Sequence, residues 1–235
     1  RPSLRFWKHA QVPELIERSL ESLNELETLA ENIANPEAMT ARSSAGSLIG
    51  AWYARPNLVR AKGMDFYDNS DKVWGNNRPK GRSWSARWQG RLTIPRNHPS
   101  PDTLYLNTSG ATTLVIDDKV VFNKRDGGEA HSAVMLQPGK AYKMVLIYNH
   151  LQTPISYLHL SISRNGGEKQ PVPAEWFSFT DEDYRAAYLN SLGSLEEQRT
   201  LGNQAPALIK RINDAREIYQ DLRSQWEREK SERNL

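Results

Sequence analysis

The side chains that most often carry catalysis are sparse and scattered in this sequence of 235 residues. Cysteine is absent, which excludes thiolate nucleophiles, disulfides and cysteine-bound metals. The five histidines stand singly, without the spacing of metal ligands: His9, His98, His131, His150 and His159. No GxSxG, HExxH or phosphate-binding glycine motif occurs, and no acidic pair stands out as a glycosidase dyad. We therefore predict a protein that is not an enzyme and has no cofactor.

Aspartates in predicted turns are the residues best suited to a metal, because calcium prefers about six to eight oxygen ligands from a loop. Two groups qualify, namely Asp65, Asp68 and Asp71 in DFYDNSD, and the pair Asp117-Asp118. Neither group has the spacing of an EF-hand, and aspartate is common in turns that bind no metal. We therefore expect no metal site.

Two tryptophans four residues apart stand among arginines in SWSARWQGRLTIP. Such a stretch suits a sugar-binding platform, a nucleic-acid platform or a buried core. Its alternation predicts a strand that ends at Pro95, and alternate residues of a strand share one face. One face carries only apolar or small residues: Trp84, Ala86, Trp88, Gly90, Leu92 and Ile94. This pattern favours the core, and with a net charge of only +3 we expect no nucleic-acid binding.

The composition indicates a globular protein, with 38% hydrophobic and 25% charged residues. No apolar run approaches the roughly 18 residues of a membrane-spanning helix, so we expect no membrane span. Because the chain begins with arginine rather than methionine, we expect a mature form or a fragment. The pattern divides it into residues 1–46, 47–179 and 180–235.

The first two regions predict a helix followed by a β domain. Residues 14–34 repeat apolar side chains every three or four positions, which is typical of an amphipathic helix, and a linker follows. Residues 47–179 contain short alternating runs separated by polar turns, including a predicted hairpin with Asp117-Asp118 at its tip. The predicted fold is mainly β: a two-sheet antiparallel β-sandwich, flanked by the N-terminal helix and a long C-terminal heptad helix.

The third region predicts helices. Thr180 is a predicted N-cap, Gly193 and Gly202 are expected to interrupt the helical pattern, and a long helix is predicted over Ala205–Arg233 with Pro206 in its first turn. Its apolar residues follow a heptad seam: Leu208, Ile212, Ala215, Tyr219, Leu222 and Trp226. The seam predicts an interface with another protein chain, the same or different. Pairing of the two terminal helices within one chain fits the pattern equally well.

Several stretches of the central region, from about residue 47 to 177, resemble the protective-antigen-type (PA-fourteen) β-sandwich domain. The motifs are GAWYARPN, WSARWQGRLTIP, DTLYLNTSGATTLVIDDKVVFN, SAVMLQPGKAYKMVLIYNH and PVPAEWF, in this order. The resemblance implies a two-sheet sandwich, of a kind found in extracellular adhesins, glycosidases and toxins as a binding or assembly module. The terminal helices lie outside it.

The resemblance also bears on calcium, because lectin members of this family bind sugars through an ion held by two consecutive aspartates. Here the corresponding place, residues 109–113, reads Ser-Gly-Ala-Thr-Thr and lacks the pair. Asp117-Asp118 lies at the hairpin tip and does not replace it. The resemblance therefore supports the fold and argues against a calcium-dependent lectin.

Three classes of function remain. The first is a non-catalytic, extracytoplasmic interaction module, a sandwich carried on a helical stalk as a subunit of a larger assembly. The second is a carbohydrate-binding module that works without calcium, for which we expect exposed aromatic and polar residues in the loops: Tyr53, Trp74, Tyr148, Asn149 and His150. An enzyme is the third class, and the sequence offers it no nucleophile–base or metal arrangement. We therefore favour the interaction module.

Overall fold

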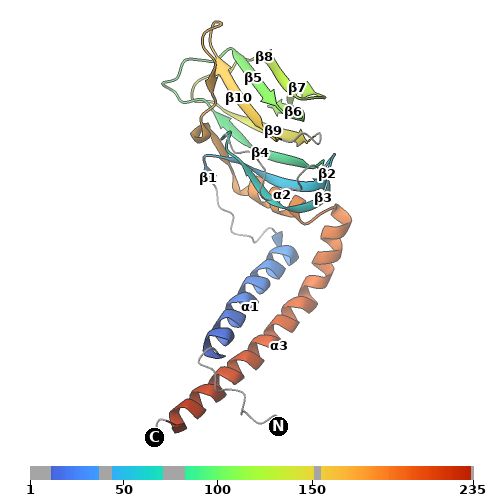
Figure 1. Cartoon of the computed structure of the whole chain (residues 1–235), viewed down its shortest axis with the longest axis vertical. Coiled ribbons are helices and arrows are strands. Elements are labelled where there is room, and N and C mark those ends of the chain that lie inside the picture. The colour runs from blue at the N-terminus through green and yellow to red at the C-terminus, as the bar shows by residue number, and fades with distance from the viewer. Residues whose placement is uncertain (1–11, 37–43, 71–82, 151–154, 234–235) are drawn as a thin grey trace. The chain divides into compact units, whose positions relative to one another are not determined.

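A computed structural model describes residues 12–36, 44–70, 83–150 and 155–233 (Figure 1). These residues divide into two compact units, one made of the strands with a short helix, and the other made of the two long helices. The helices are α1 (Val12–Ala34), α2 (Asp181–Ser191) and α3 (Leu195–Arg233). Among the described residues, no helix is long and apolar enough to cross a membrane.

The strands form two antiparallel sheets, as predicted. Within the described residues, the larger sheet has the order β1-β12-β4-β9-β6-β7, with β2 pairing β4 and β3 beyond β2. Its strands are β1 (Ser44–Ala45), β2 (Leu48–Arg55), β3 (Val59–Tyr67), β4 (Ser85–Thr93), β6 (Ala111–Ile116), β7 (Lys119–Lys124), β9 (Ala141–Asn149) and β12 (Phe177–Phe179). β12 directly follows the 3₁₀ helix η3 (Ala174–Trp176).

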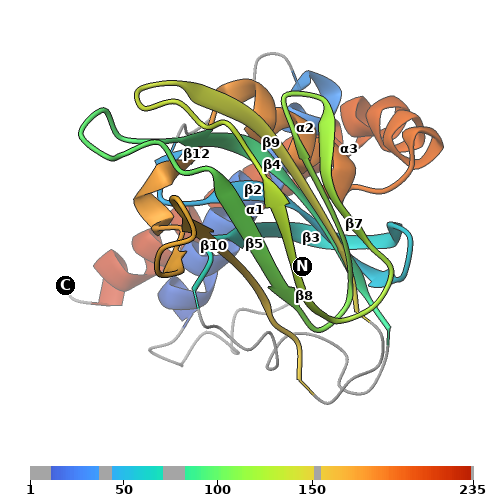
Figure 2. The ribbon, with the colours of Figure 1, turned by 90° about the horizontal axis from the view of Figure 1, so that it is seen from above.

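The smaller sheet has the order β11-β10-β5-β8. Its strands are β5 (Thr103–Thr108), β8 (Gly128–Ala133), β10 (Leu158–Ser163) and β11 (Gln170–Pro171). Seen from above, β5, β8 and β10 lie side by side (Figure 2). The alternation of buried and half-exposed residues along β5 shows that only one face of this sheet is in the core.

The tryptophan-bearing strand lies in the core, as its alternation predicted. Trp84 and Trp88 are fully buried in one cluster with residues of both sheets. The indole Nε1 of Trp88 donates a hydrogen bond of 3.0 Å to a carboxylate oxygen of Asp65 on β3, so the buried donor is satisfied. These rings therefore stabilise the sandwich and do not form a ligand platform.

Local signals in the sequence predicted two connections correctly. Asp117 and Asp118 both have positive φ, as a two-residue hairpin turn of type I′ requires, and they join β6 to β7. Thr180 is the N-cap of α2 and forms a capping box with Asp183. α2 packs on β2 and β3, so it belongs to the unit of the strands, whereas the sequence grouped it with the long helix.

The long helix differs from its prediction at the N-terminal end. α3 begins at Leu195 and runs through Gly202 and Pro206 without a break, whereas the sequence predicted a helix starting at Ala205. Gly202 lies against the backbone of α1, since a Cβ placed on it would be 3.8 Å from the carbonyl oxygen of Ile33. The helix thus continues here despite the low helix propensity of glycine and the missing proline N–H.

Candidate functional site

The loop residues predicted to bind a ligand do not form an exposed site. Tyr53, Tyr148 and His150 are all buried, so the expectation that these side chains are exposed is wrong. The amide oxygen of Asn149 accepts a hydrogen bond of 2.7 Å from the backbone N–H of Asn57. Trp74 lies outside the described residues. Strand alternation explains the error, because Tyr148 is one of the inward residues of β9.

A buried polar cluster occupies the end of β9. The hydroxyl groups of Tyr148 and Ser109 lie 2.7 Å apart, and Tyr148 also lies 3.3 Å from Nδ1 of His150. The imidazole of His150 stacks on Trp84 with ring centroids 5.7 Å apart. Burial raises the pKa of Tyr148 to about 12, so its hydroxyl remains protonated at neutral pH. These hydrogen-bonding groups join the loop after β5, which contains Ser109, to the end of β9 inside the protein.

The place of the family's calcium-binding aspartates is closed by backbone. A Cβ on Gly110 would lie 2.3 Å from the carbonyl oxygen of Asn149, so no side chain fits there without a shift of the chain. The neighbouring Ser109 accepts a hydrogen bond of 2.8 Å from the backbone N–H of Tyr157. Over the described part of the chain, no cluster of His, Asp and Glu has the arrangement of a metal site.

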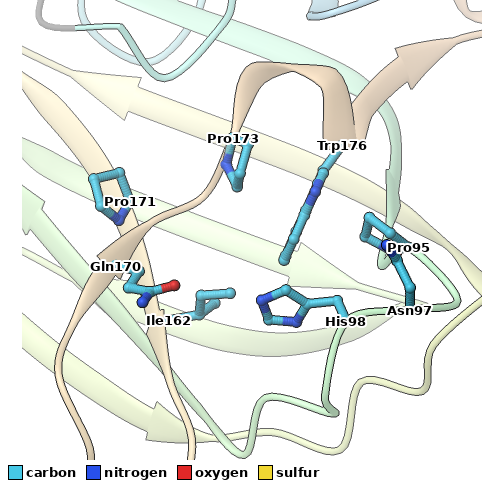
Figure 3. A pocket seen from close by; sticks show the side chains of 8 residues that line it. All are labelled: Pro95, Asn97, His98, Ile162, Gln170, Pro171, Pro173 and Trp176. Carbon is cyan, nitrogen blue, oxygen red and sulfur yellow. The ribbon is translucent and has the colours of Figure 1, made fainter.

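A hollow of 290 Å³ lies where the loop after β4 meets the segment after β10 (Figure 3). The imidazole of His98 meets Trp176 edge to face, with ring centroids 4.7 Å apart, and its Nδ1 donates a hydrogen bond of 2.7 Å to the carbonyl of Pro99. The lining is mostly proline, aliphatic and amide: Pro95, Asn97, His98, Ile162, Gln170, Pro171, Pro173 and Trp176. His98 also lines a second hollow, of 190 Å³, together with Ser163, Arg164 and Glu168.

The outer face of the smaller sheet carries rings and charges that the sequence analysis did not single out. Tyr105 is paired in register with His131 on β8, and their ring centroids are 6.0 Å apart. Lys169 places its ammonium 4.7 Å from the Tyr105 ring and 3.2 Å from the Glu129 carboxylate. His159 stacks on Tyr157 nearby. Tyr105, Glu129, His159 and Lys169 line a hollow of 250 Å³. The signal for it in the sequence was the outward positions of LYLN and HLSIS.

The two long helices form an antiparallel pair, which we call the hairpin. On each helix, a line of five residues with the spacing 4, 3, 4, 3 faces the other helix. We call it the inward line. All ten residues are buried or half-buried: Ile16, Leu20, Leu23, Glu27 and Ala30 on α1, and Ala205, Ile209, Ile212, Arg216 and Tyr219 on α3. The terminal helices therefore pair within one chain, which was one of the two readings of the heptad pattern.

Ion pairs cross the hairpin near its middle and toward the end of α3. The guanidinium of Arg216 pairs with the carboxylate of Glu27 and donates a hydrogen bond of 3.1 Å to the side-chain oxygen of Asn24. Arg223 lies 2.9 Å from a carboxylate oxygen of Glu17. Because the residue numbers fall on α1 as they rise on α3, these contacts fix the antiparallel direction.

The second line of apolar residues on the hairpin is exposed. Leu15 and Leu26 of α1 are 58% and 46% exposed, and Leu208 and Ile218 of α3 are 42% and 60% exposed. We call these four residues the outer apolar face. The predicted seam thus divides: Ile212 and Tyr219 belong to the inward line, Leu208 to the outer apolar face, and Ala215, Leu222 and Trp226 are half-buried.

The comparisons with known proteins place the chain by its fold. No protein-family model and no curated protein sequence matches it. A solved anti-sigma factor domain-containing protein from Clostridium clariflavum is similar at 19% identity and a TM-score of 0.50, over 60% of this chain and 50% of that one. The match thus spans about half the length of that protein.

Two further solved structures are PA14 domains. The domain of the MpAFP antifreeze protein is 12% identical, with a TM-score of 0.47, over 63% of this chain and 97% of that domain. The sugar-binding domain of an RTX adhesin is 12% identical, with a TM-score of 0.42, over 58% of this chain and 100% of that domain. The fold resembles that of PA14 domains. This resemblance, predicted from the sequence motifs, concerns the architecture of the sandwich alone.

Proposed function

We propose that the protein is a non-catalytic interaction module, in which a PA14-like sandwich is joined to a helical hairpin that docks on helices of other protein chains. The observation that carries this proposal is the outer apolar face. An amphipathic helix normally buries its apolar residues, and here each helix also has large apolar residues that the hairpin leaves exposed. A second helical element that covers Leu26 and Ile218 would remove this exposed apolar surface from water.

The opposite side of the hairpin supports the same assignment. At about 100° per residue, Asn24 and Glu31 of α1 and Asn213 and Glu217 of α3 lie on the side away from the outer apolar face. That side is polar, as expected for a surface in contact with water. The contrast between the two sides points to a surface built for a partner rather than to a generally apolar hairpin.

The non-catalytic part of the proposal follows from what the hollows contain. The hollow of Figure 3 has a single imidazole in its lining, and the hollow beside Tyr105 holds Glu129 in an ion pair with Lys169. Glu168 lines another hollow with His98, but the described hydrogen bonds and ion pairs do not join these two side chains. An acid–base or nucleophilic mechanism needs two such groups within hydrogen-bond reach of one substrate. A binding role requires neither an acid–base pair nor a nucleophile.

We also propose an extracytoplasmic location and a place in a larger assembly. The support is the motif resemblance to a module found in cell-surface and secreted proteins. Fractionation of the source cells with an antibody to the sandwich tests the location. Recovery of the chain with the cytoplasmic fraction alone would contradict it.

Site-specific photo-crosslinking tests the docking role. A photoreactive residue at position 26 or 218 lies on the outer apolar face, whereas position 28 or 220 lies on the polar side of the same helices. We expect crosslinks to helical segments of another chain from the first pair and few from the second, as read by peptide mass spectrometry. Equal yields from both sides, or none from either, would refute docking through this face.

A second candidate function is calcium-independent glycan binding, favoured by the ring-lined hollow on the outer face of the smaller sheet. Tyr105 and His159 line this hollow together with the polar groups of Asn107 and Lys169, and aromatic rings beside polar groups are the combination that binds sugars. Glycan-array binding in EDTA, lost on Tyr105→Ala and kept on Thr113→Ala in the other sheet, would support it. An array without signal would remove it.

A further inference from the structure

The two helices of the hairpin repeat one pattern. The inward line occupies positions 16, 20, 23, 27 and 30 of α1 and positions 205, 209, 212, 216 and 219 of α3, with identical spacing. At about 100° per residue, Leu15 and Leu26 are rotated by about 90° around α1 from the centre of its inward line, against the direction in which the chain winds. On α3, Leu208 is rotated by about 60° and Ile218 by about 140° from the centre of the inward line, in the same rotational sense.

Rotation in the same sense places all four residues on one side of the hairpin. Two antiparallel helices that face each other are related by a two-fold axis perpendicular to the plane that contains them. A rotation about this axis moves a residue of one helix onto the residue of the other helix that has the same rotation from its inward line. The rotation keeps the residue on the same side of the plane. Leu15 and Leu26 therefore share one side of the hairpin with Leu208 and Ile218.

The whole side of the hairpin that carries these four residues has nearly the size of a stable protein interface. α1 has 23 residues, so at about 1.5 Å per residue it is about 34 Å long. Two helices of about 10 Å diameter side by side give a face of roughly 700 Å². A stable complex buries about 800 Å² on each partner, so one face of this hairpin nearly suffices when it meets a face of equal size.

A second hairpin of the same kind provides such a face. Two amphipathic helix pairs that meet through their apolar sides make a four-helix bundle, in which each helix contacts two neighbours. A symmetric dimer uses the same patch on both copies, so it needs only one self-complementary surface. The outer apolar face meets this condition, since it consists of aliphatic side chains from both helices.

Charge decides how the two hairpins are oriented. α1 has six glutamates and one arginine, a net charge of −5, whereas α3 has eight acidic and eight basic residues. Contact between the α1 helices of two copies would bring two acidic helices together. A two-fold axis parallel to the helices avoids this contact, because it puts α1 of each copy against α3 of the other.

We propose that the occupant of the outer apolar face is a second copy of this chain, and that the two hairpins form a four-helix bundle with α1 of each copy against α3 of the other. This inference rests on the proposed docking function of the hairpin and specifies its partner. Glu27 and Asn24 contact Arg216, so Leu26 and Ile218 lie at nearly the same height along the hairpin. In the bundle, Leu26 of one copy is therefore near Ile218 of the other.

Mass in solution gives the first test. Sedimentation equilibrium of the full 235-residue chain over a dilution series should give twice the chain mass of 26.8 kDa. The variant with Leu26→Glu and Ile218→Glu should have the single-chain mass. The control with Thr28→Glu and Gln220→Glu adds the same charge to the polar side and should remain a dimer.

Crosslinking gives a second test that does not depend on a destabilising substitution. The chain has no cysteine, so Leu26→Cys and Ile218→Cys each introduce a single thiol. A mixture of the two variants, treated with a short bifunctional maleimide, should give more covalent dimer than either variant alone. Greater yield from Leu26→Cys alone would overturn the arrangement, because it would place the two α1 helices together.

The outcomes separate this inference from the proposed function. A wild-type chain that is monomeric throughout the series overturns the inference, while photo-crosslinks from positions 26 and 218 to a different protein would leave the docking function standing. A dimer that survives Leu26→Glu with Ile218→Glu also overturns it, because the contact then lies elsewhere. A dimer lost in this variant, kept in the control and crosslinked in the mixture supports it.

Discussion

The guanidinium of Arg216 on α3 pairs with the carboxylate of Glu27 on α1, at a position in each helix where the heptad pattern would otherwise place an apolar side chain. The same guanidinium also donates to the side-chain oxygens of Asn24 and Asn213, the latter at 2.6 Å. A polar pair within an apolar seam favours the one register in which its members meet. We infer that this pair selects the register of the hairpin.

Substitution of Glu27 should change how the hairpin responds to acid. The hydrogen bond from Arg216 lowers the pKa of Glu27 from its ordinary value of 4.5, aided by the attraction of the guanidinium charge. The pair's contribution is therefore complete above about pH 4.5 and is lost as the pH falls through the lowered pKa. Melting of the hairpin, followed by helical circular dichroism, should depend less on pH in Glu27→Gln than in the wild type.

The matched control for this pH effect is Arg216→Met, which removes the cause of the lowered pKa but leaves the carboxyl group in place. Both single variants and the double variant should then show the same reduced dependence on acid, as expected for one shared interaction. If Glu27→Gln leaves the acid response unchanged, the pair does not contribute to hairpin stability.

Ile212 should be the most costly aliphatic residue to truncate on the inward line of α3. Its side chain is buried against α1, and removal of a buried isoleucine side chain down to the Cβ costs about 2–5 kcal/mol. Amide hydrogen exchange of α1 and α3 should accelerate in Ile212→Ala while that of the strands is unchanged. Lys210→Ala, on the exposed side, should stay within about 0.5 kcal/mol of the wild type. Equal effects of both variants would show that the hairpin does not pack as described.

The sandwich was the part of the fold that the sequence predicted best, because its signals are local. Strand alternation placed Trp84 and Trp88 in the core, and turn chemistry located Asp117-Asp118 between two strands. The start of α3 could not be predicted in this way. Gly202 is a weak helix former by itself, and its position beside α1 is visible only in the structure.

The candidate sites were harder to predict than the fold, for the same reason. Tyr148 and His150 look like loop residues of a ligand site, but whether a ring near a strand end faces inward depends on the register of both sheets. The heptad seam correctly indicated helix packing, yet Leu208 is exposed while Ala205 is buried. Which line of residues on α3 makes the contact depends on the register of the partner helix. The heptad seam of α3 alone does not specify that register.

Calcium should have no effect on the stability of the sandwich. In lectin members of the resembled family two aspartates hold the ion, whereas here Gly110 is pressed against the backbone of Asn149 and Ser109 is hydrogen-bonded to Tyr148. We expect equal melting temperatures in calcium and in EDTA. A calcium-dependent rise in melting temperature would contradict this expectation.

A substitution at Gly110 should sharpen the same test. Gly110→Asp should destabilise the sandwich without creating calcium binding, because its Cβ has no room beside the carbonyl of Asn149. Ala111→Asp is the matched control, since it adds the same carboxylate at the half-exposed next position and should be tolerated better. Thermal melting of both variants, with and without calcium, checks this. Equal stability of the two variants would show that the backbone at Gly110 is not closely packed.

Pro206 should be a weak point of α3, because it lies inside the helix. Proline lacks the N–H that would bond to the carbonyl of Gly202, and its ring crowds that carbonyl, which costs about 3 kcal/mol in an ordinary helix interior. Pro206→Ala should therefore slow amide hydrogen exchange in the surrounding turns of α3. Pro13→Ala is the matched control, since Pro13 lies in the first turn of α1, where the N–H has no intrahelical partner and proline costs little. Equal or greater protection from the control than from Pro206→Ala would show that Pro206 does not limit the stability of the hairpin.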